Sequence, residues 1–447
     1  MSAVVESIAS QAATELVAPH PSWPFAFGPG GQVVSRGRFI RQVHGVAATL
    51  PQAGYVVNLC EDRYRFLVAF CAAALRGQTS LLPSSRAPSA VEAVQARHPG
   101  SYCLGDHSLT SHPRDFLCLP EELPEIEGDS PVLPADALVA IGFTSGSTGQ
   151  PGAHPKHWSS FRTSTRQNLA ALGDMLDPAG SWLVATVPPQ HMYGMEFSVL
   201  LPLLAPVAVH VARPFFPGDV ARALADSPAP ALLATTPVHL RALLGSGIAF
   251  PPLAGIVSAT APLPRELAAE AELRFGCEVR EVFGSTETCV FARRRTARED
   301  AWTPLPGVRL APRPDGTAVH APHLDQPVVL ADLVQLHADG RFELCGRQAD
   351  LLEIAGKRAS LADLTRALLE VPGVRDGVVL QLEPDTAGVR RIAAVAVAPG
   401  LDPAAVLNAL KPQFDPVFLP RRLRLVDALP RNATGKLPRD RLLEMFD

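Results

Sequence analysis

The sequence lacks the features of metal-cluster, disulfide-rich and nucleic-acid-binding proteins. Its 7 cysteines form no C-x-x-C pair and leave an odd one over, which is typical of reduced thiols in the cytoplasm. Charge of one sign does not dominate either, because the net charge is -4 and the charged residues are mixed along the chain. No field of one sign would therefore attract nucleic acid or an anionic membrane.

The sequence also lacks a long hydrophobic run and a basic N-terminal segment. The longest apolar run, residues 197–212, contains two prolines and is shorter than the roughly 20 residues of a membrane-spanning helix. The N-terminus carries Glu6 and Glu15 but no basic segment, unlike a signal peptide. We expect no membrane span, a cytoplasmic location, and a buried helix followed by a strand over residues 197–212.

The residues that are present indicate an α/β fold. Of 447 residues, 47% are hydrophobic and 19% are charged, so the chain can bury large cores and should form at least two domains. Short apolar runs rich in β-branched residues predict buried strands, at residues 138–143, 182–187, 207–211, 231–236, 254–259 and 279–284. Helical spacing separates several of them, at residues 219–227, 237–246 and 262–276. This alternation predicts parallel-rich sheets wound by helices on both faces.

The C-terminal part has a different pattern. After residue 347 it predicts two helices and two strands, at residues 361–371, 402–414, 377–382 and 391–398. These elements suffice for a compact α+β domain of roughly 100 residues. We therefore predict a large domain over residues 1–346 and a small domain over residues 347–447.

Unusual polar sequences follow several predicted strands. Ligands bind outside the carboxyl ends of parallel strands, so the loops after Phe143, Val187, Ser258 and Phe283 should share one rim. The first reads FTSGSTGQPGAHPKHW, residues 143–158. Its hydroxyls suit a triphosphate, and its glycines let backbone N–H groups turn toward an anion. The same composition is also typical of a flexible linker.

Two further clusters carry chargeable side chains. Glu287 lies in EVFGSTET, and Lys436 lies in PRNATGKLPR near the C-terminus. A carboxylate beside a phosphate-binding loop can hold the Mg²⁺ that accompanies ATP. Alone, however, a glutamate in a turn or a lysine near a terminus is more often simply solvated, so the clusters must be considered together.

Together, TSGSTG, FGSTE, the ADL…DGR…GR series and PRNATGKLPR, in that order, resemble the adenylate-forming superfamily. This superfamily includes acyl- and aryl-CoA synthetases, luciferases and peptide-synthetase adenylation domains, and the resemblance covers about residues 130–447. The loop variant QPGAHPKHW is most similar to the compact hydroxybenzoate:acyl carrier protein ligases of xanthomonadin and aryl-polyene pigment biosynthesis. The resemblance implies the fold of the superfamily, in which a small mobile C-terminal lid carries the catalytic lysine.

The resemblance also implies a role for each matching residue. Thr286 would contact the α-phosphate, Glu287 would hold Mg²⁺, and Lys436 would bridge the substrate carboxylate and the α-phosphate. The other nucleotide-binding residues would be Thr144, Ser145, Gly146, Ser147, Thr148 and Gly149 at the β- and γ-phosphates, Ser258, Ala259, Thr260, Phe283, Gly284 and Ser285 around the adenine side, Asp332 and Arg347 at the ribose, and Arg358 facing the nucleotide or thiol. The acid pocket would be lined by His191, near the acyl carboxylate, and by Tyr193, Met195 and Ser258.

Some positions depart from the family pattern. Gly152 stands where a lysine normally follows the loop proline, so Lys156 would reach the γ-phosphate instead, unless it is a surface charge. Ala349 replaces a charged residue in the predicted pivot, GRQAD. His154 and His157 flank Lys156, but no third metal ligand is apparent, which argues against a metal site there.

Two segments, at residues 193–197 and 420–426, each have two possible interpretations. Tyr193, Met195 and Phe197 could equally be core side chains rather than pocket residues. The basic segment PRRLRLV, residues 420–426, is either a docking surface for an acidic carrier protein or a solvated strand edge.

The function that the resemblance implies is the adenylation of a small aromatic carboxylic acid with ATP and Mg²⁺, and its transfer to the thiol of an acyl carrier protein. One alternative is the same reaction with free CoA. Another is a degenerate nucleotide-binding module without catalysis, against which intact Glu287 and Lys436 argue. The oxygenase chemistry of luciferases is remote, because nothing in the sequence selects for it.

Overall fold

The structure is a computed structural model, and it describes residues 14–18, 23–107, 113–144, 152–314, 316–347, 351–354, 357–383, 391–412, 416–432 and 437–446. The chain divides into two compact units, Met1–Val308 with Ala321–Gln326, and Arg309–His320 with Pro327–Asp447. The domain boundary predicted between residues 346 and 347 was placed at the pivot about which a C-terminal lid would move. This boundary stays a prediction, because residues 348–350 of the pivot lie outside the described residues.

The larger sheet of the first unit contains five of the six strands predicted in the middle of the chain. Its described strands are, in spatial order, β17 (Thr303–Pro304), β16 (Cys289–Arg294), β15 (Val279–Ser285), β14 (Leu253–Ser258), β13 (Ala231–Thr235), β11 (Ser181–Ala185), β12 (Val207–His210), β2 (Pro24–Gly28) and β3 (Gln32–Ser35). Strands β11 to β15 pair in parallel. Strand β13 is buried along its whole length, as expected for a strand with both faces covered.

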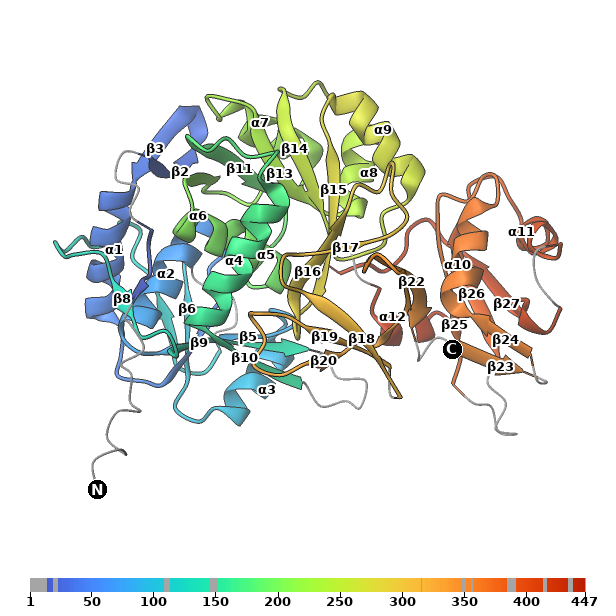
Figure 1. Cartoon of the computed structure of the whole chain (residues 1–447), viewed down its shortest axis with the longest axis horizontal. Helices are drawn as coiled ribbons and strands as arrows, with labels where there is room; N and C mark the ends of the chain where they lie inside the picture. Colours follow the sequence, from blue (N-terminus) through green and yellow to red (C-terminus); the bar gives the residue numbers. More distant parts are fainter. Residues whose placement is uncertain are drawn as a thin grey trace. The chain divides into compact units, whose positions relative to one another are not determined.

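Helices cover both faces of this sheet (Figure 1). One face packs against α7 (Pro217–Ala225), α8 (Pro237–Gly245) and α9 (Arg265–Phe275), which share an apolar core with the strands. Their ends follow local rules: the Thr236 side chain accepts a hydrogen bond from the His239 N–H at the start of α8, and α9 ends at Gly276 with φ 65°. The three predicted helices are confirmed.

The other face of the sheet contacts α4 (Trp158–Leu172), α5 (Met192–Met195) and α6 (Leu201–Leu204). A short π-helix, η2 (Glu196–Leu200), joins α5 to α6, and β12 follows. The apolar run at residues 197–212 is therefore a buried helical segment and a strand, as predicted. No helix in the described part of the chain is long and apolar enough to cross a membrane.

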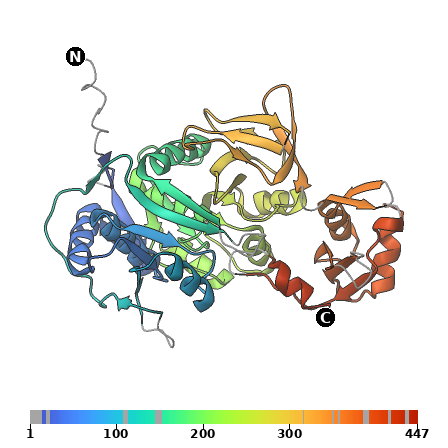
Figure 2. The ribbon, with the colours of Figure 1, turned by 90° about the horizontal axis from the view of Figure 1, so that it is seen from below.

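A second sheet contains the predicted strand at residues 138–143. Its described strands are β10 (Gly152–His157), β9 (Leu138–Thr144), β5 (Thr79–Leu82), β4 (Tyr55–Asn58), β6 (Tyr102–Gly105) and β7 (Phe116–Cys118), with α1 (Arg36–Thr49), α2 (Arg63–Leu75) and α3 (Pro88–Arg97) nearby. Strand β10 pairs antiparallel with β9 at the edge of this sheet. In Figure 2 the teal β9–β10 pair continues the blue strands β4 and β5. A short pair, β1 (Thr14–Glu15) and β8 (Val132–Leu133), lies apart from both large sheets in the pairing order.

The position of β9 corrects one expectation. Phe143 was predicted to end a strand on the same rim as Val187, Ser258 and Phe283, but β9 belongs to a different sheet from the strands before those loops. Periodicity reports that a strand is buried and not which sheet it joins. Residues of the two rims nevertheless meet at the site described below.

The second unit is built from short antiparallel strands and a small α+β core. Its elements are β18 (Arg309–Arg313), β19 (Gly316–His320), β20 (Val328–Val329), β21 (Asp332–Leu336), β22 (Phe342–Arg347), β23 (Leu351–Ile354), β24 (Lys357–Ser360), α10 (Leu361–Glu370), β25 (Asp376–Gln381), β26 (Ile392–Val397), α11 (Pro403–Leu410), β27 (Arg422–Leu425) and α12 (Arg439–Leu443). Apolar side chains of α10, α11 and β26 form one core. The predicted helix at 361–371 and the strands at 377–382 and 391–398 are confirmed. The helix predicted at 402–414 is confirmed over Pro403–Leu410, and its last two predicted residues lie outside the described residues.

Candidate active site

The turn between β15 and β16 presents Thr286 and Glu287. It is tight, because Ser285 lies opposite Cys289 in the strand register and a Cβ atom on Gly284 would lie 2.1 Å from the carbonyl oxygen of Cys289. The Ser285 N–H donates to the Thr288 hydroxyl at 3.0 Å, and the Thr288 N–H donates to the Ser285 hydroxyl at 3.2 Å. These hydrogen bonds within the turn fix the backbone on both sides of Thr286 and Glu287, whose side chains are partly buried.

The Glu287 carboxylate is ionised and partly accessible. Its side chain is 35% exposed. Burial by itself would raise the pKa of Glu287, but hydrogen bonds from Ser285 and the backbone, with His154 and Lys156 nearby, lower that pKa below its ordinary value. A carboxylate that stays charged and reaches solvent fits the oxygen-ligand preference of Mg²⁺.

The β9–β10 hairpin of the second sheet lies against this turn. His154 Nε2 is 3.4 Å from Glu287 Oε1 and 3.2 Å from the Thr144 hydroxyl. A Cβ atom on Gly142 would lie 2.6 Å from Thr286 Cγ2, so glycine is needed where the two sheets meet. The connecting residues Ser145, Gly146, Ser147, Thr148 and Gly149 lie outside the described residues, and their role at the phosphates stays a prediction.

Lys156 is not a surface charge. The residue is 4% exposed, and its ammonium group donates to the main-chain carbonyl of Glu287 at 3.0 Å. The surface alternative is therefore wrong. A contact of Lys156 with the γ-phosphate stays a prediction, and the contact that the structure shows is with the Glu287 turn.

The residues proposed for the acid pocket lie mainly in the core. His191 immediately precedes α5 as its N-cap residue. The Tyr193 hydroxyl donates to the Val257 carbonyl at 2.8 Å, and its ring centroid is 5.1 Å from that of Phe197. Met195 and Phe197 are fully buried. Met195 and Phe197 are therefore core side chains in this structure. A pocket role for His191 and Tyr193 stays a prediction.

The predicted adenine-side residues lie at the ends of β14 and β15. The Ser258 hydroxyl is buried and has no hydrogen-bond partner among the described residues, which is unusual for a buried polar group. A contact of Ser258 with a ligand stays a prediction. Thr260, just beyond Ala259, adopts a positive φ of 81°. The Phe283 ring lies 5.2 Å from both Phe291 and Trp302. The role of Phe283 on the adenine side stays a prediction.

The remaining predicted residues belong to the second unit. Asp332 and Arg347 lie directly opposite each other in the register of β21 and β22, so sequence positions 15 residues apart meet on one hairpin. Arg358 lies in β24. Lys436 lies outside the described residues. The ribose role of the Asp332–Arg347 pair and the roles of Arg358 and Lys436 stay predictions.

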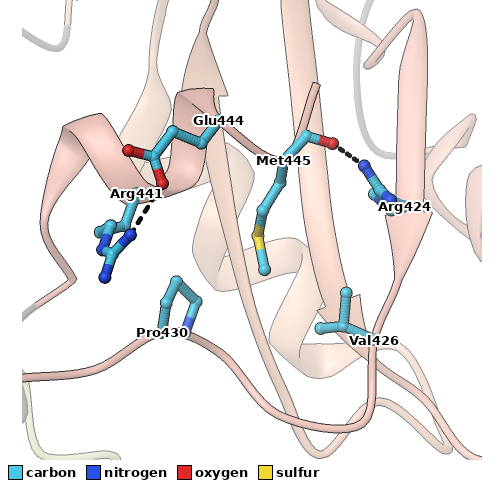
Figure 3. Close-up of a pocket in the computed structure, with 6 residues that line it drawn as sticks. All are labelled: Arg424, Val426, Pro430, Arg441, Glu444 and Met445. Carbon is cyan, nitrogen blue, oxygen red and sulfur yellow. Dashed lines mark hydrogen bonds and ion pairs between the residues drawn. The ribbon is translucent and has the colours of Figure 1, made fainter. Parts of the chain in front are cut away.

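A shallow surface pocket lies in the second unit, where Arg424, Val426, Pro430, Arg441, Glu444 and Met445 line it (Figure 3). Arg424 donates to the Met445 carbonyl, and the Arg422 guanidinium lies 5.3 Å from the centroid of the Phe446 ring. Two arginines of the basic segment at 420–426 thus hold the C-terminal residues. Docking of a carrier protein on this segment stays a prediction.

His239 is a residue near the strand ends that sequence reasoning missed. Its Nδ1 is 2.9 Å from the Thr186 hydroxyl, which lies 3.0 Å from the Thr235 hydroxyl. Its ring packs against Phe215 at 5.2 Å between centroids. The sequence TTPVHL after a predicted strand could have indicated this polar cluster, since it follows the carboxyl end of β13.

His239 should make the stability of the first unit depend on pH. Burial, with a smaller effect of Arg213, lowers the pKa of His239 from 6.5 to about 4. The unfolded chain therefore binds more protons than the folded chain between pH 4 and 6.5, so stability falls as pH falls through this window, by up to about 3 kcal/mol. Thermal melts of the wild type and His239→Asn at pH 4.5 and 7.5 test this: the variant should lose less of its melting temperature on acidification, and equal losses would contradict it.

The sequence profile described as "AMP-binding enzyme" matches residues 45–319. The chain therefore belongs to the family of AMP-binding enzymes, which are adenylate-forming enzymes that use ATP with Mg²⁺. The predicted superfamily and its two cofactors are confirmed. The finer resemblance to hydroxybenzoate:acyl carrier protein ligases stays a prediction.

Particular relatives are CoA ligases. A 4-coumarate–CoA ligase of Rhodobacter capsulatus is 31% identical over 303 residues, 68% of this chain and 75% of the relative. A probable 2-succinylbenzoate–CoA ligase of Mycobacterium tuberculosis is 27% identical over 342 residues, 70% of this chain and 85% of the relative. The o-succinylbenzoate CoA synthetase of Bacillus subtilis, in complex with ATP and magnesium ion, aligns with TM-score 0.79 and 20% identity over 94% of this chain and 97% of that chain. This last similarity confirms the fold.

Proposed function

We propose that this AMP-binding enzyme adenylates a small aromatic acid of the hydroxybenzoate type and transfers it to the phosphopantetheine thiol of an acyl carrier protein. The observation that carries the adenylation step is the ionised Glu287 carboxylate on a rigid turn beside Thr286 and the β9–β10 hairpin. The relatives named 4-coumarate–CoA and 2-succinylbenzoate–CoA ligase act on aromatic acids, which supports the substrate class. The carrier protein rests on the resemblance of the QPGAHPKHW loop.

The first step joins two anions. A carboxylate oxygen of the acid attacks the α-phosphorus of ATP, the bond from the α-phosphorus to the bridging oxygen breaks, and pyrophosphate leaves with that electron pair. Mg²⁺ held by Glu287 would neutralise phosphate charge, and electrostatic help at the point where charge develops can contribute several kcal/mol. Thr286 would orient the α-phosphate, and the Lys436 ammonium would reduce the repulsion between the two anions.

The second step uses the activated carbonyl. The acyl-adenylate is a mixed anhydride, so a thiolate attacks its carbonyl carbon and AMP leaves, while the thiol proton passes to solvent. The thiol of a carrier protein and that of CoA satisfy this chemistry equally.

All 7 cysteines of the chain are free, which supports a reducing compartment such as the cytoplasm as the place of the reaction.

The acceptor is tested by giving the enzyme both thiols. With ATP, Mg²⁺ and an accepted acid, thioester formation is measured on holo carrier protein and on free CoA at equal concentrations. A larger kcat/KM for the carrier protein supports the proposal. A larger value for CoA would replace it with the CoA ligase that the names of the relatives suggest. Apo carrier protein, which lacks the phosphopantetheine thiol, is the control.

The rival from another class is a nucleotide-binding module that has lost catalysis. Binding of Mg·ATP alone would also use the Glu287 carboxylate, so turnover decides between the two. ATP binding without acid-dependent pyrophosphate release, over a panel that includes benzoates, cinnamates and fatty acids, would favour the module.

A further inference from the structure

Three buried side chains bond to the main chain of residues 287–290. Lys156 donates to the Glu287 carbonyl, His323 Nε2 lies 2.6 Å from the Thr288 carbonyl, and Glu196 accepts from the Val290 N–H at 3.0 Å. The three side chains are 4%, 3% and 1% exposed, respectively. They come from β10, the segment 321–326 and η2, which are distant in the sequence.

Lys156 joins this set because of the period of its strand. Side chains two residues apart in a strand face the same way, so His154 and Lys156 of β10 both face the turn. His154 Nε2 lies 3.4 Å from the Glu287 carboxylate, whereas Lys156 donates to the Glu287 carbonyl. Strand β10, with the sequence GAHPKH, therefore contacts both the side-chain carboxylate and the main-chain carbonyl of Glu287.

Glu196 holds the Val290 end of the turn. Its carboxylate accepts hydrogen bonds from the Ser164 hydroxyl at 2.5 Å, the Asn168 amide at 3.0 Å and the Val290 N–H. Burial raises the pKa of Glu196 above its ordinary value, and these hydrogen bonds and the Lys156 charge offset only part of that rise. Buried polar groups are tolerated when they are hydrogen-bonded, as this carboxyl is.

Cys289 lies in the chain between the Thr288 carbonyl that His323 contacts and the Val290 N–H that Glu196 accepts from, and its φ is 55°. That conformation costs free energy for a residue other than glycine, so the surrounding contacts must hold the backbone in it.

We infer that Lys156, Glu196 and His323 form a turn cradle, whose purpose is to position Glu287 and Thr286 for the Mg·ATP complex. Lys156 is a positioning residue in this account and acts through the Glu287 main chain. The inference rests on the proposed role of Glu287 as the metal-binding carboxylate. It goes beyond that role by assigning Lys156 to the turn and not to a phosphate.

Binding of ATP without any acid or thiol tests the cradle. Calorimetric titration gives the ATP affinity with Mg²⁺ and with EDTA, and the ratio is the gain due to the metal. In Lys156→Met this gain should fall about 10- to 100-fold, as is typical when a group that orients a metal ligand is removed. The affinity in EDTA should stay within about twofold. A direct contact of Lys156 with phosphate would instead lower both affinities, and that result would overturn the inference.

Further variants separate positioning from stability. In the Glu287→Gln background, Lys156→Met should reduce the gain from Mg²⁺ no further, because the two changes act on one ligand. An additional loss of similar size would overturn the inference. If Lys156→Met does not fold, the double variant Lys156→Met with Glu196→Gln, which removes both buried ionisable side chains, should show the same lost gain. Lys411→Met, at an exposed lysine that contacts Asn408, is the matched control and should bind as the wild type.

The wild type also separates this inference from the assignment beneath it. If Mg²⁺ adds nothing to ATP binding by the wild type, Glu287 is not a metal ligand and the cradle has no such role. If Mg²⁺ strengthens binding by the wild type and equally by Lys156→Met, the metal site stands and the cradle inference is wrong.

Discussion

Glu287→Gln should lower acid-dependent pyrophosphate release by about 100-fold or more at low Mg²⁺. Glutamine keeps the size of the side chain and one carbonyl oxygen but removes the negative charge, which the local hydrogen bonds stabilise in the wild type by lowering the pKa of Glu287. A metal bound more weakly can be restored by mass action. Raising Mg²⁺ should therefore recover part of the lost rate, and the Mg²⁺ concentration at half-maximal rate should increase.

The control for this variant is Glu92→Gln, at an exposed glutamate of α3. It should leave the rate and the Mg²⁺ dependence unchanged. A Glu287→Gln enzyme with a normal melting temperature and the Mg²⁺ dependence of the wild type would remove Glu287 from the metal site. Rates are measured with coupled pyrophosphate detection at several Mg²⁺ concentrations and saturating ATP.

Lys436→Ala should separate the two half-reactions. Adenylation should fall about 100- to 1,000-fold, because the ammonium group acts where the carboxylate and the α-phosphate are pressed together. Transfer from a preformed acyl-adenylate to the thiol should stay within about threefold of the wild type, because the attack on the mixed anhydride does not use this lysine. The first step is followed by pyrophosphate release and the second by thioester formation from synthetic acyl-adenylate.

Lys411→Ala, at an exposed lysine of the same unit, is the matched control and should affect neither step. Equal losses in both steps of Lys436→Ala would assign the lysine to a structural role or to both reactions. The sequence supports the role of Lys436 through PRNATGKLPR alone, so this pair of assays is its most direct test.

The sequence predicts the core of this protein well, because local patterns decide it. The buried strands at 182–187, 231–236 and 254–259 are found as β11, β13 and β14 within two residues of the predicted bounds. Their apolar runs and flanking turn residues are sufficient to specify them. The Glu287 turn is also predictable, since Gly284 and Ser285 determine a tight turn after a strand.

What the sequence did not predict depends on contacts between distant segments. Lys156 and Glu287 are 131 residues apart, and no local pattern indicates that the lysine is buried beneath the turn. His323 lies in the segment 321–326, whose place in the first unit is visible only after folding. The separate sheet of β9 was missed for the same reason, because a run of apolar residues carries no information about its partner strands.

The most direct measurement of the central claim is pyrophosphate release from Mg·ATP across a panel of benzoates, hydroxybenzoates, cinnamates and fatty acids. The account predicts release that depends on the acid and is fastest, by kcat/KM, with hydroxybenzoates. One added or missing methylene should change that ratio by only about 10- to 200-fold, so related benzoates should react more slowly rather than be silent. Release that is fastest with fatty acids would contradict the aromatic substrate, and no release with any acid, while ATP still binds, would contradict the adenylation itself.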